Sequence, residues 1–117
     1  MSEVEGVVRR YYETVDSLGA EATVALFTED ATYRRPGYDV IEGREALTRF
    51  YGGERVIVSG RHTIDEIVVE GRRAAVRGRF HGELRDGTHV EVGFADFMHY
   101  EGDLIADRTT YFYQPSV

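Results

Sequence analysis

Two aspartates stand among apolar residues near the end of the chain and are the first candidates for chemistry. Asp96 lies in the segment 91–100 (EVGFADFMHY), and Asp107 lies in the segment 104–113 (LIADRTTYFY). Alternating apolar residues in both segments are typical of strands with one buried face. Burying a carboxylate is costly unless it is paired or hydrogen-bonded. Two buried carboxylates on neighbouring strands are therefore candidates for acid–base catalysis.

The short turn between the two segments decides which residues share a face. A two-residue turn at Glu101-Gly102 predicts that Asp96 and Asp107 lie directly opposite each other. Cross-strand neighbours have Cβ atoms roughly 5 Å apart, and two negative charges repel at that distance. One carboxyl group is then expected to hold a proton at neutral pH, with coupled titration of the two groups. Such a pair could supply both an acid and a base.

The preceding turn extends this inner face. The segment 84–88 (LRDGT) fits a three-residue loop with Gly87 in the left-handed conformation, whereas a two-residue turn would reverse the faces. The three-residue loop groups apolar residues together. The predicted inner face then consists of Gly78, Phe80, Gly82, Val92, Phe94, Asp96, Met98, Asp107, Thr109 and Tyr111. Its two glycines leave space, so we interpret the face as the wall of a pocket.

The opposite face of the predicted sheet takes Phe97, His99, Ala106 and Arg108. Apolar residues on a face that a monomer leaves in water indicate an interaction surface. We therefore expect a homodimer through this outer face, with Phe97 and Ala106 near its centre.

Helices are expected to precede these strands. Apolar residues recur at steps of three and four from Val4 to Leu18, and further helices are predicted over 20–27 and 43–53. A short strand near Tyr33 closes at Pro36, which has no amide donor. Four antiparallel strands are expected in 62–113. The pattern predicts one α+β domain over 1–117, with helices on one face of a curved sheet.

Composition limits the function classes. The formal net charge is −7 with no basic patch, which argues against a nucleic-acid partner. The chain has no cysteine, which excludes disulfides and thiolate chemistry. No metal site is predicted, because the four histidines form no HxH or HxxxH pair; they are His62, His81, His89 and His99. No apolar run approaches a membrane span and no signal peptide precedes the domain, so a cytoplasmic location is expected.

Three segments resemble a known family. They are 7–37 (VVRRYYETVDSLGAEATVALFTEDATYRRPG), 43–51 (GREALTRFY) and 95–105 (ADFMHYEGDLI). Together they resemble the nuclear transport factor two-like superfamily, in its SnoaL-like and ketosteroid isomerase branches, over nearly the whole chain. The resemblance implies a cone of three N-terminal helices packed on a strongly curved, mostly antiparallel sheet, with an open internal pocket. It also implies dimers through the outer sheet face.

The resemblance assigns roles to individual residues. Ketosteroid isomerases use an aspartate base and an oxyanion hole made of a tyrosine and a protonated aspartate. Tyr11 matches that tyrosine, and Asp96 matches the protonated aspartate. Arg35 stands at the position of the base, and an arginine stays charged and cannot accept a proton near neutral pH. This departure argues against a Δ5-ketosteroid isomerase.

Three functions are compatible with these residues. The first is cofactor-independent proton transfer on a carbonyl compound, as in the cyclases and isomerases that the chain resembles. Asp96 and Asp107 would move the proton, while Arg35 and Tyr11 polarise the carbonyl oxygen. The second is an epoxide hydrolase using Asp96, Arg35 and Asp107 like the Asp-Arg-Asp set of limonene epoxide hydrolases. The third is a non-catalytic protein that binds a hydrophobic small molecule. In each case the predicted contacts to the small molecule are Tyr33, Phe50, Phe80, Val92, Phe94, Met98, Thr109 and Tyr111.

Overall fold

The structure, a computed structural model, describes residues 3–54 and 57–113. Its elements are α1 (Glu3–Ser17), α2 (Ala20–Val24), β1 (Phe27–Arg34), β2 (Ile41–Glu42), α3 (Gly43–Arg49), the π-helical turn η1 (Phe50–Glu54), β3 (Ile57–Glu70), β4 (Arg73–Leu84), β5 (His89–Glu101) and β6 (Leu104–Phe112). The predicted α+β class is confirmed. In the described ranges, no helix has the length and apolar character needed to cross a membrane.

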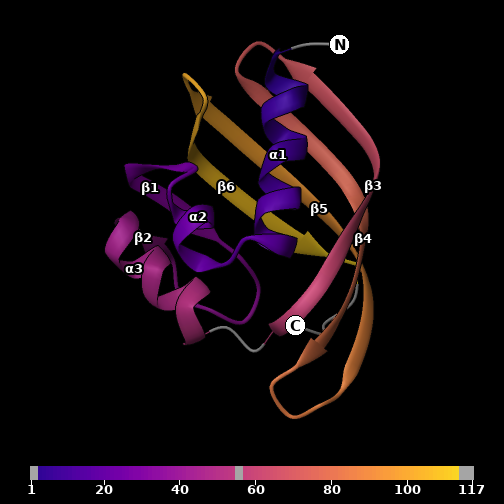
Figure 1. Cartoon of the computed structure of the whole chain (residues 1–117). Coiled ribbons are helices and arrows are strands. Elements are labelled where there is room, and N and C mark those ends of the chain that lie inside the picture. The colour runs from indigo at the N-terminus through magenta and orange to yellow at the C-terminus, as the bar shows by residue number, and fades with distance from the viewer. Residues whose placement is uncertain (1–2, 55–56, 114–117) are drawn as a thin grey trace.

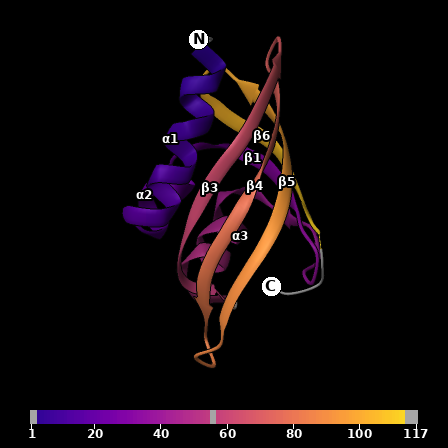
Figure 2. The same cartoon turned by 90° about the vertical axis from the view of Figure 1, so that its right-hand side faces the viewer.

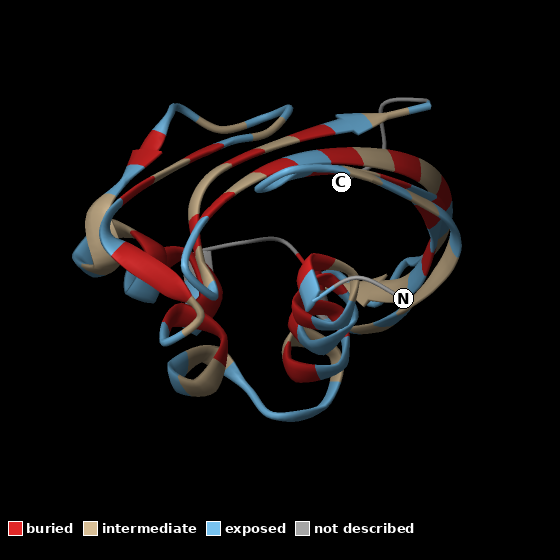
Figure 3. Cartoon of the chain, turned by 90° about the horizontal axis from the view of Figure 1, so that it is seen from above, coloured by how far each residue is buried: buried red, intermediate tan, exposed pale blue. Residues whose placement is uncertain are grey.

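All six strands belong to one sheet with the order β2-β1-β6-β5-β4-β3 (Figure 1). β1 runs parallel to β6, and the other neighbouring strands are antiparallel. Seen from above, the sheet forms an arc with α1 on its concave side (Figure 3). β3 runs beside α1 (Figure 2), and α3 packs against β1. The concave face is therefore the buried face of the sheet.

Local sequence explains where α1 begins and ends. Glu3 and Glu5 place negative charge in its first turn, which favours a helix N-terminus. Its buried side carries Val4, Val7, Val8, Tyr11, Tyr12 and Thr14. Gly19 follows the helix with a φ of 88°, a conformation that glycine adopts without strain. Leu18, predicted at the end of the apolar stripe, lies beyond the helix and is exposed.

The segment 20–27, predicted as a helix, is divided between a helix and a strand. α2 ends at Val24, and Phe27 already pairs with Ile105 of β6. β1 is longer than the short strand predicted near Tyr33. Its parallel pairing with β6 and the short strand β2 were not predicted. Long-range pairing has no local signal in the sequence, because it depends on a partner almost 80 residues away.

The β4–β5 hairpin confirms the part of the predicted inner face that lies on these two strands. Phe80 lies opposite Val92, and both are buried. Gly87 has a φ of 87° in the connecting loop. Burial alternates along both strands (Figure 3), as a half-buried sheet requires.

The loop of the β5–β6 hairpin lies one residue further along the chain than predicted. Glu101 is opposite Leu104, so Gly102 and Asp103 form the turn, and Gly102 has a φ of 59°. Each residue of β5 at this end therefore pairs with a residue of β6 that lies two positions further along the chain than predicted. This shift leaves the faces unchanged, because side-chain direction repeats with period two.

A β-bulge at Ala106 does change the faces. Tyr100 is opposite Ile105, but the next residue of β5, His99, is opposite Asp107. Ala106 is thus one extra residue of β6. An extra residue in one strand reverses the inward and outward directions of the residues that follow it.

The predicted pairing of Asp96 with Asp107 is therefore wrong. Asp96 lies opposite Thr110 on the concave face and is fully buried. Asp107 lies on the convex face, where it forms a half-exposed ion pair of 3.0 Å with Arg34.

Because of the same bulge, three further predictions are wrong. Thr109 and Tyr111, predicted to line the pocket, lie on the convex face, where Tyr111 is exposed. Arg108, predicted on the outer face, is buried on the concave face. Thr110 is buried beside it.

Glycines make room for an aromatic ring on the concave face. The Phe80 ring lies over the backbone of Gly60 on β3 and Gly82 on β4, and an added Cβ atom at either glycine would collide with it. At Gly82 that Cβ atom would also lie 2.6 Å from the Ser59 carbonyl oxygen. The ring can therefore lie flat against the sheet only while both positions lack a side chain.

We expect Gly82→Ala to lower the free energy of unfolding by about 1–3 kcal/mol, because the Phe80 ring must move within a packed interior. Urea denaturation measures the change. Gly93→Ala is the matched control, because its Cβ atom would lie 3.4 Å from the Tyr113 Cβ, an ordinary contact. The control should change stability by less than about 0.5 kcal/mol. Equal losses in the two variants would contradict this account of Phe80.

Candidate active site

A buried ion pair lies at the centre of the concave face. Nη2 of Arg108 donates a hydrogen bond of 2.8 Å to Oδ2 of Asp96. The two side chains are 5% and 0% exposed. A buried charge without a partner is strongly destabilising, so each of the two residues depends on the other.

Asp96 is held as a carboxylate. The Tyr12 hydroxyl donates to Oδ2 at 2.5 Å, and the Thr110 hydroxyl donates to Oδ1. Burial by itself would raise the pKa of Asp96, but the charge of Arg108 and the three donors outweigh it, and the pKa is lowered. The protonated aspartate that the family resemblance implies is therefore not the state that this environment favours.

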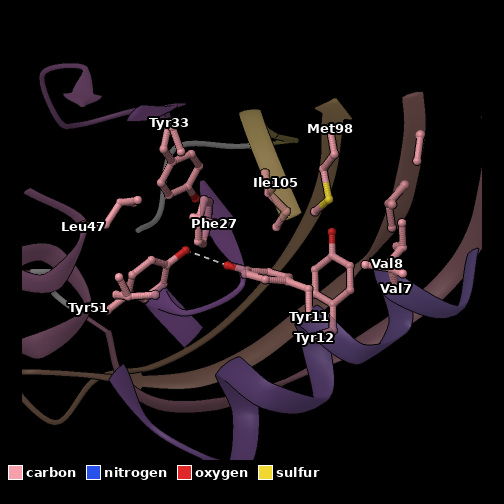
Figure 4. Close-up of a cluster of buried hydrophobic side chains, with 14 of the residues drawn as sticks. Val7, Val8, Tyr11, Tyr12, Phe27, Tyr33, Leu47, Tyr51, Met98 and Ile105 are labelled. Carbon is pink, nitrogen blue, oxygen red and sulfur yellow. Dashed lines mark hydrogen bonds between the residues drawn. The ribbon is translucent and has the colours of Figure 1, made fainter. Parts of the chain in front are cut away.

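Two tyrosine hydroxyls share the other terminal nitrogen of Arg108. Nη1 donates to the Tyr11 hydroxyl at 2.6 Å and to the Tyr51 hydroxyl at 3.1 Å. The two hydroxyl oxygens are 2.6 Å apart and point toward each other from α1 and η1 (Figure 4). Burial raises the pKa of Tyr11 well above its ordinary value, although the charge of Arg108 opposes the shift. Tyr11 therefore stays protonated and remains a hydrogen-bond donor.

A chain of hydrogen bonds connects Asp96 to Arg35. Thr110 has one hydroxyl proton, and Asp96 accepts it. The bond of 3.0 Å between Tyr33 and Thr110 therefore has the tyrosine as its donor. Nη1 of Arg35 in turn donates to the Tyr33 hydroxyl at 3.3 Å. Three aromatic rings surround the Arg35 guanidinium at 5.2–5.3 Å from its central carbon; they belong to Tyr38, Phe50 and Phe112.

A small cavity lies beside these polar side chains on the concave side of the sheet. Its lining consists of Tyr11, Val15, Tyr33, Arg35, Tyr51, Ile57, His62, Phe80, Phe94, Arg108, Thr110 and Phe112. The free space is about 30 Å³, which holds one or two waters. Aromatic rings supply most of the apolar wall.

The predicted site residues divide into three groups. Those that line the cavity are Tyr11, Tyr33, Arg35, Phe80 and Phe94. Those that are buried without lining it are Phe50, Val92, Asp96 and Met98. Those that lie on the convex face are Asp107, Thr109 and Tyr111.

His62 was not assigned a role from the sequence, yet it lines the cavity. Its ring nitrogen Nδ1 lies 2.6 Å from Oδ1 of Asp16, and its backbone N–H donates to Oδ2 of Asp16 at 2.8 Å. The ring packs against Tyr12, Phe80 and Phe94 at centroid distances of 4.8–5.4 Å. The side chains of His62 and Asp16 are each 15% exposed.

Some of the missed residues had a signal in the sequence. Tyr12 and Asp16 are four residues apart, which places them on one side of α1. Tyr51 lies in the segment 43–53 that was predicted as a helix, but it received no chemical role. Arg108 and Thr110 had no such signal, because one bulge decides their face.

Comparisons with known proteins agree with this architecture. The family model of the SnoaL-like domain matches residues 8–108. A steroid Δ-isomerase of Nocardioides simplex is 40% identical over 52 residues, which are 44% of this chain and 42% of that protein. These matches confirm the resemblance to the SnoaL-like branch of the nuclear transport factor two-like superfamily.

Solved structures share the fold at low sequence identity. SalBIII, described as an epoxide hydrolase/cyclase-like enzyme in pyran ring formation in the polyether salinomycin, gives a TM-score of 0.84 at 20% identity, covering 94% of this chain and 90% of that one. A protein of Catenulispora acidiphila with a ketosteroid isomerase-like fold, solved with trimethylamine, gives 0.82 at 20% identity, covering 94% and 86%. At these identities the likeness shows the fold alone.

We expect Asp96→Asn to lower the free energy of unfolding by about 3–5 kcal/mol at pH 7, because it leaves the Arg108 charge buried without its partner. The pKa of Asp96 is lowered in the folded state. Its contribution is therefore complete above the unfolded value of about 4 and is lost as the pH falls through the folded value. The difference between wild type and variant should shrink below about pH 4.

Urea unfolding at pH 7 and at pH 3–4 measures this difference. Asp107→Asn is the matched control, because its ion pair with Arg34 is half exposed. That substitution should cost at most about 1 kcal/mol. A pH-independent difference between wild type and Asp96→Asn would contradict the ionised state of Asp96.

Proposed function

Because the chain belongs to the SnoaL-like domain family, we propose that it is a cofactor-independent enzyme that transfers a proton on a small carbonyl compound, as a cyclase or an isomerase. One observation carries the proposal. The hydroxyls of Tyr11 and Tyr51 meet at the cavity wall, and buried Arg108 donates to both. This arrangement suits the stabilisation of an enolate oxygen.

The physical argument rests on preorganised charge. Removing a proton beside a carbonyl group moves negative charge onto the oxygen. Donors that are already oriented in a site without bulk water stabilise that charge most, since nothing has to reorganise during the reaction. Tyr11 and Tyr51 share one hydrogen bond, so one hydroxyl donates to the other and the second hydroxyl proton is left for the enolate oxygen. Arg108 places a full positive charge behind the two hydroxyls, a role that the sequence had suggested for Arg35.

In this proposal Asp96 is a positioning residue. It does not line the cavity, and its oxygens already accept from Arg108, Tyr12 and Thr110. Its contribution is to fix the guanidinium of Arg108 so that Nη1 faces the two tyrosines. Asp96 therefore acts through Arg108.

Binding of a carbonyl compound must widen the cavity. Typical small-molecule pockets hold about 300–1,000 Å³, which is far more than the free space here. Phe112 lines that space, is only partly buried, and is the side chain placed to move aside. The open internal pocket expected from the family resemblance belongs to this proposal as the ligand-bound state.

The positions of the three residues argue against the epoxide hydrolase alternative. It required Asp107 beside Asp96 and Arg35, and the bulge at Ala106 puts Asp107 on the convex face. The second candidate is a non-catalytic protein that binds a hydrophobic small molecule. The predominantly aromatic lining favours this alternative.

Binding of 2-naphthol tests the proposal, because its naphtholate resembles an enolate. Removing either hydroxyl takes one donor out of the hydrogen-bonded pair that ends on the charged oxygen, which should cost about 1.5–3 kcal/mol, or roughly 10- to 100-fold in affinity. We expect this loss for Tyr11→Phe and for Tyr51→Phe, measured by fluorescence titration. Tyr111→Phe on the convex face is the control and should bind like wild type. Unchanged affinity in both cavity variants would leave only the binding-protein alternative.

We also propose a homodimer through the convex face. Phe97 and Tyr111 are 53% and 56% exposed there, and the centroids of their rings lie 5.9 Å apart. Ala106, predicted near the centre, is the half-buried residue of the bulge.

Light scattering should give a dimer for the wild type and a monomer for Phe97→Glu, because the new charge would be buried between two apolar surfaces. Leu18→Glu is the matched control, since Leu18 is 69% exposed away from the sheet. A wild-type monomer at micromolar concentration would rule out the interface.

A further inference from the structure

His62 and Asp16 form a second polar group at the cavity, distinct from the Arg108 cluster. Both oxygens of Asp16 contact the same residue: Oδ2 accepts the backbone N–H of His62 at 2.8 Å, and Oδ1 lies 2.6 Å from Nδ1 of its ring. This double contact fixes the histidine in place. The rings of Phe80 and Phe94 hold the imidazole from the sheet side.

The contact also selects the tautomer of the imidazole. A carboxylate can only accept, so Nδ1 must carry the proton in the Asp16–His62 bond. The lone pair of the neutral ring is then on Nε2. Among the described residues, no hydrogen bond to Nε2 is found. A histidine oriented in this way by a carboxylate is suited to accept a proton and to be stabilised once it is charged.

We propose that His62 is the general base of the proton transfer and that Asp16 is its positioning residue. This inference rests on the proposed function, because it supplies the base that the Tyr11–Tyr51 pair requires. The sequence had assigned the proton transfer to the Asp96–Asp107 pair, but Asp107 lies on the other face of the sheet. Arg35 occupies the position where related isomerases have a base, and it cannot accept a proton.

The step balances within one substrate molecule. Nε2 of His62 takes a proton from the carbon beside the carbonyl group, and the electron pair of the broken C–H bond moves to the carbonyl oxygen. The Tyr11–Tyr51 pair stabilises the resulting enolate through the hydroxyl proton that is not shared between the two tyrosines, while Asp16 stabilises the imidazolium. Nε2 then returns the proton to a different carbon of the same molecule, which leaves the enzyme unchanged.

The surroundings of His62 are compatible with this role. Asp16 and Tyr12 face it from α1, and Phe80 and Phe94 of the sheet carry no charge. The other polar side chains that line the cavity are Tyr11, Tyr33, Arg35, Tyr51, Arg108 and Thr110. Among the carboxylates of the described residues, only Asp16 is found within ion-pair distance of the imidazole.

Isomerisation of cyclohex-3-enone to the conjugated cyclohex-2-enone, followed by ultraviolet absorbance, tests the proposal with a small probe. We expect His62→Gln to lower kcat by about a hundredfold or more, since general base catalysis contributes that much. His81→Gln is the matched control, because His81 is a half-exposed histidine paired with Glu91 at 2.9 Å. It should retain the wild-type rate.

Asp16→Asn distinguishes positioning from a purely structural contact. An asparagine amide can donate to Nδ1, which would move the proton to Nε2 and remove the base. We expect kcat to fall by about a hundredfold or more with little change in KM, and ¹⁵N NMR should show the exchanged tautomer. Wild-type tautomer and rate in Asp16→Asn would overturn the positioning role.

The naphthol titration separates failure of this inference from failure of the proposed function. If wild type and His62→Gln isomerise the probe equally fast, His62 is not the base, while the enolate site stands. If wild type binds 2-naphthol but does not isomerise the probe, His62 does not act as a base on carbonyl compounds and this inference is overturned. If loss of the tyrosine hydroxyls leaves naphthol binding unchanged, the proposed function fails as well.

Discussion

The Asp96–Arg108 ion pair is the interaction on which the rest of the interior depends. Two charges are removed from water at the centre of the sheet, so donors and acceptors left unpaired around them are costly, and in the described part of the chain Nε of Arg108 is buried without a hydrogen-bond partner. Tyr12 and Thr110 satisfy the carboxylate, and Tyr11 and Tyr51 take the far side of the guanidinium. Four elements therefore meet at one pair: α1, η1, β5 and β6.

The two residues of the ion pair lie differently with respect to the cavity. The carboxylate does not line the cavity and both of its oxygens accept hydrogen bonds, whereas the guanidinium lines the cavity and donates to two hydroxyls there. Positive character is thus presented to the cavity, and its counter-charge lies behind it. A neutral acid at the position of Asp96 would donate to a ligand itself. The ionised Asp96 instead strengthens the donors in front of it.

Helix α1 supplies a polar contact to each part of this interior. Tyr11 reaches Arg108, Tyr12 reaches Asp96, and Asp16 reaches His62 on β3. These contacts place the helix against the concave sheet more specifically than its valines can, because hydrogen bonds depend on direction whereas apolar packing does not. The flat position of the Phe80 ring over two glycines leaves the remaining space between helix and sheet as the cavity.

The sequence by itself determined the α+β class, the order of helices and strands apart from β2, and the inner face of β4 and β5, because these follow from local periodicity and turn residues. It also determined that Asp96 and Tyr11 lie inside. Only the tertiary structure decided the face of β6. The extra residue at Ala106 puts Arg108 instead of Asp107 on the concave face. A bulge forms where the curved sheet accommodates it, and no local sequence signal marks that place. The Asp16–His62 contact likewise joins residues 46 positions apart, and no spacing rule connects a helix end to a distant strand.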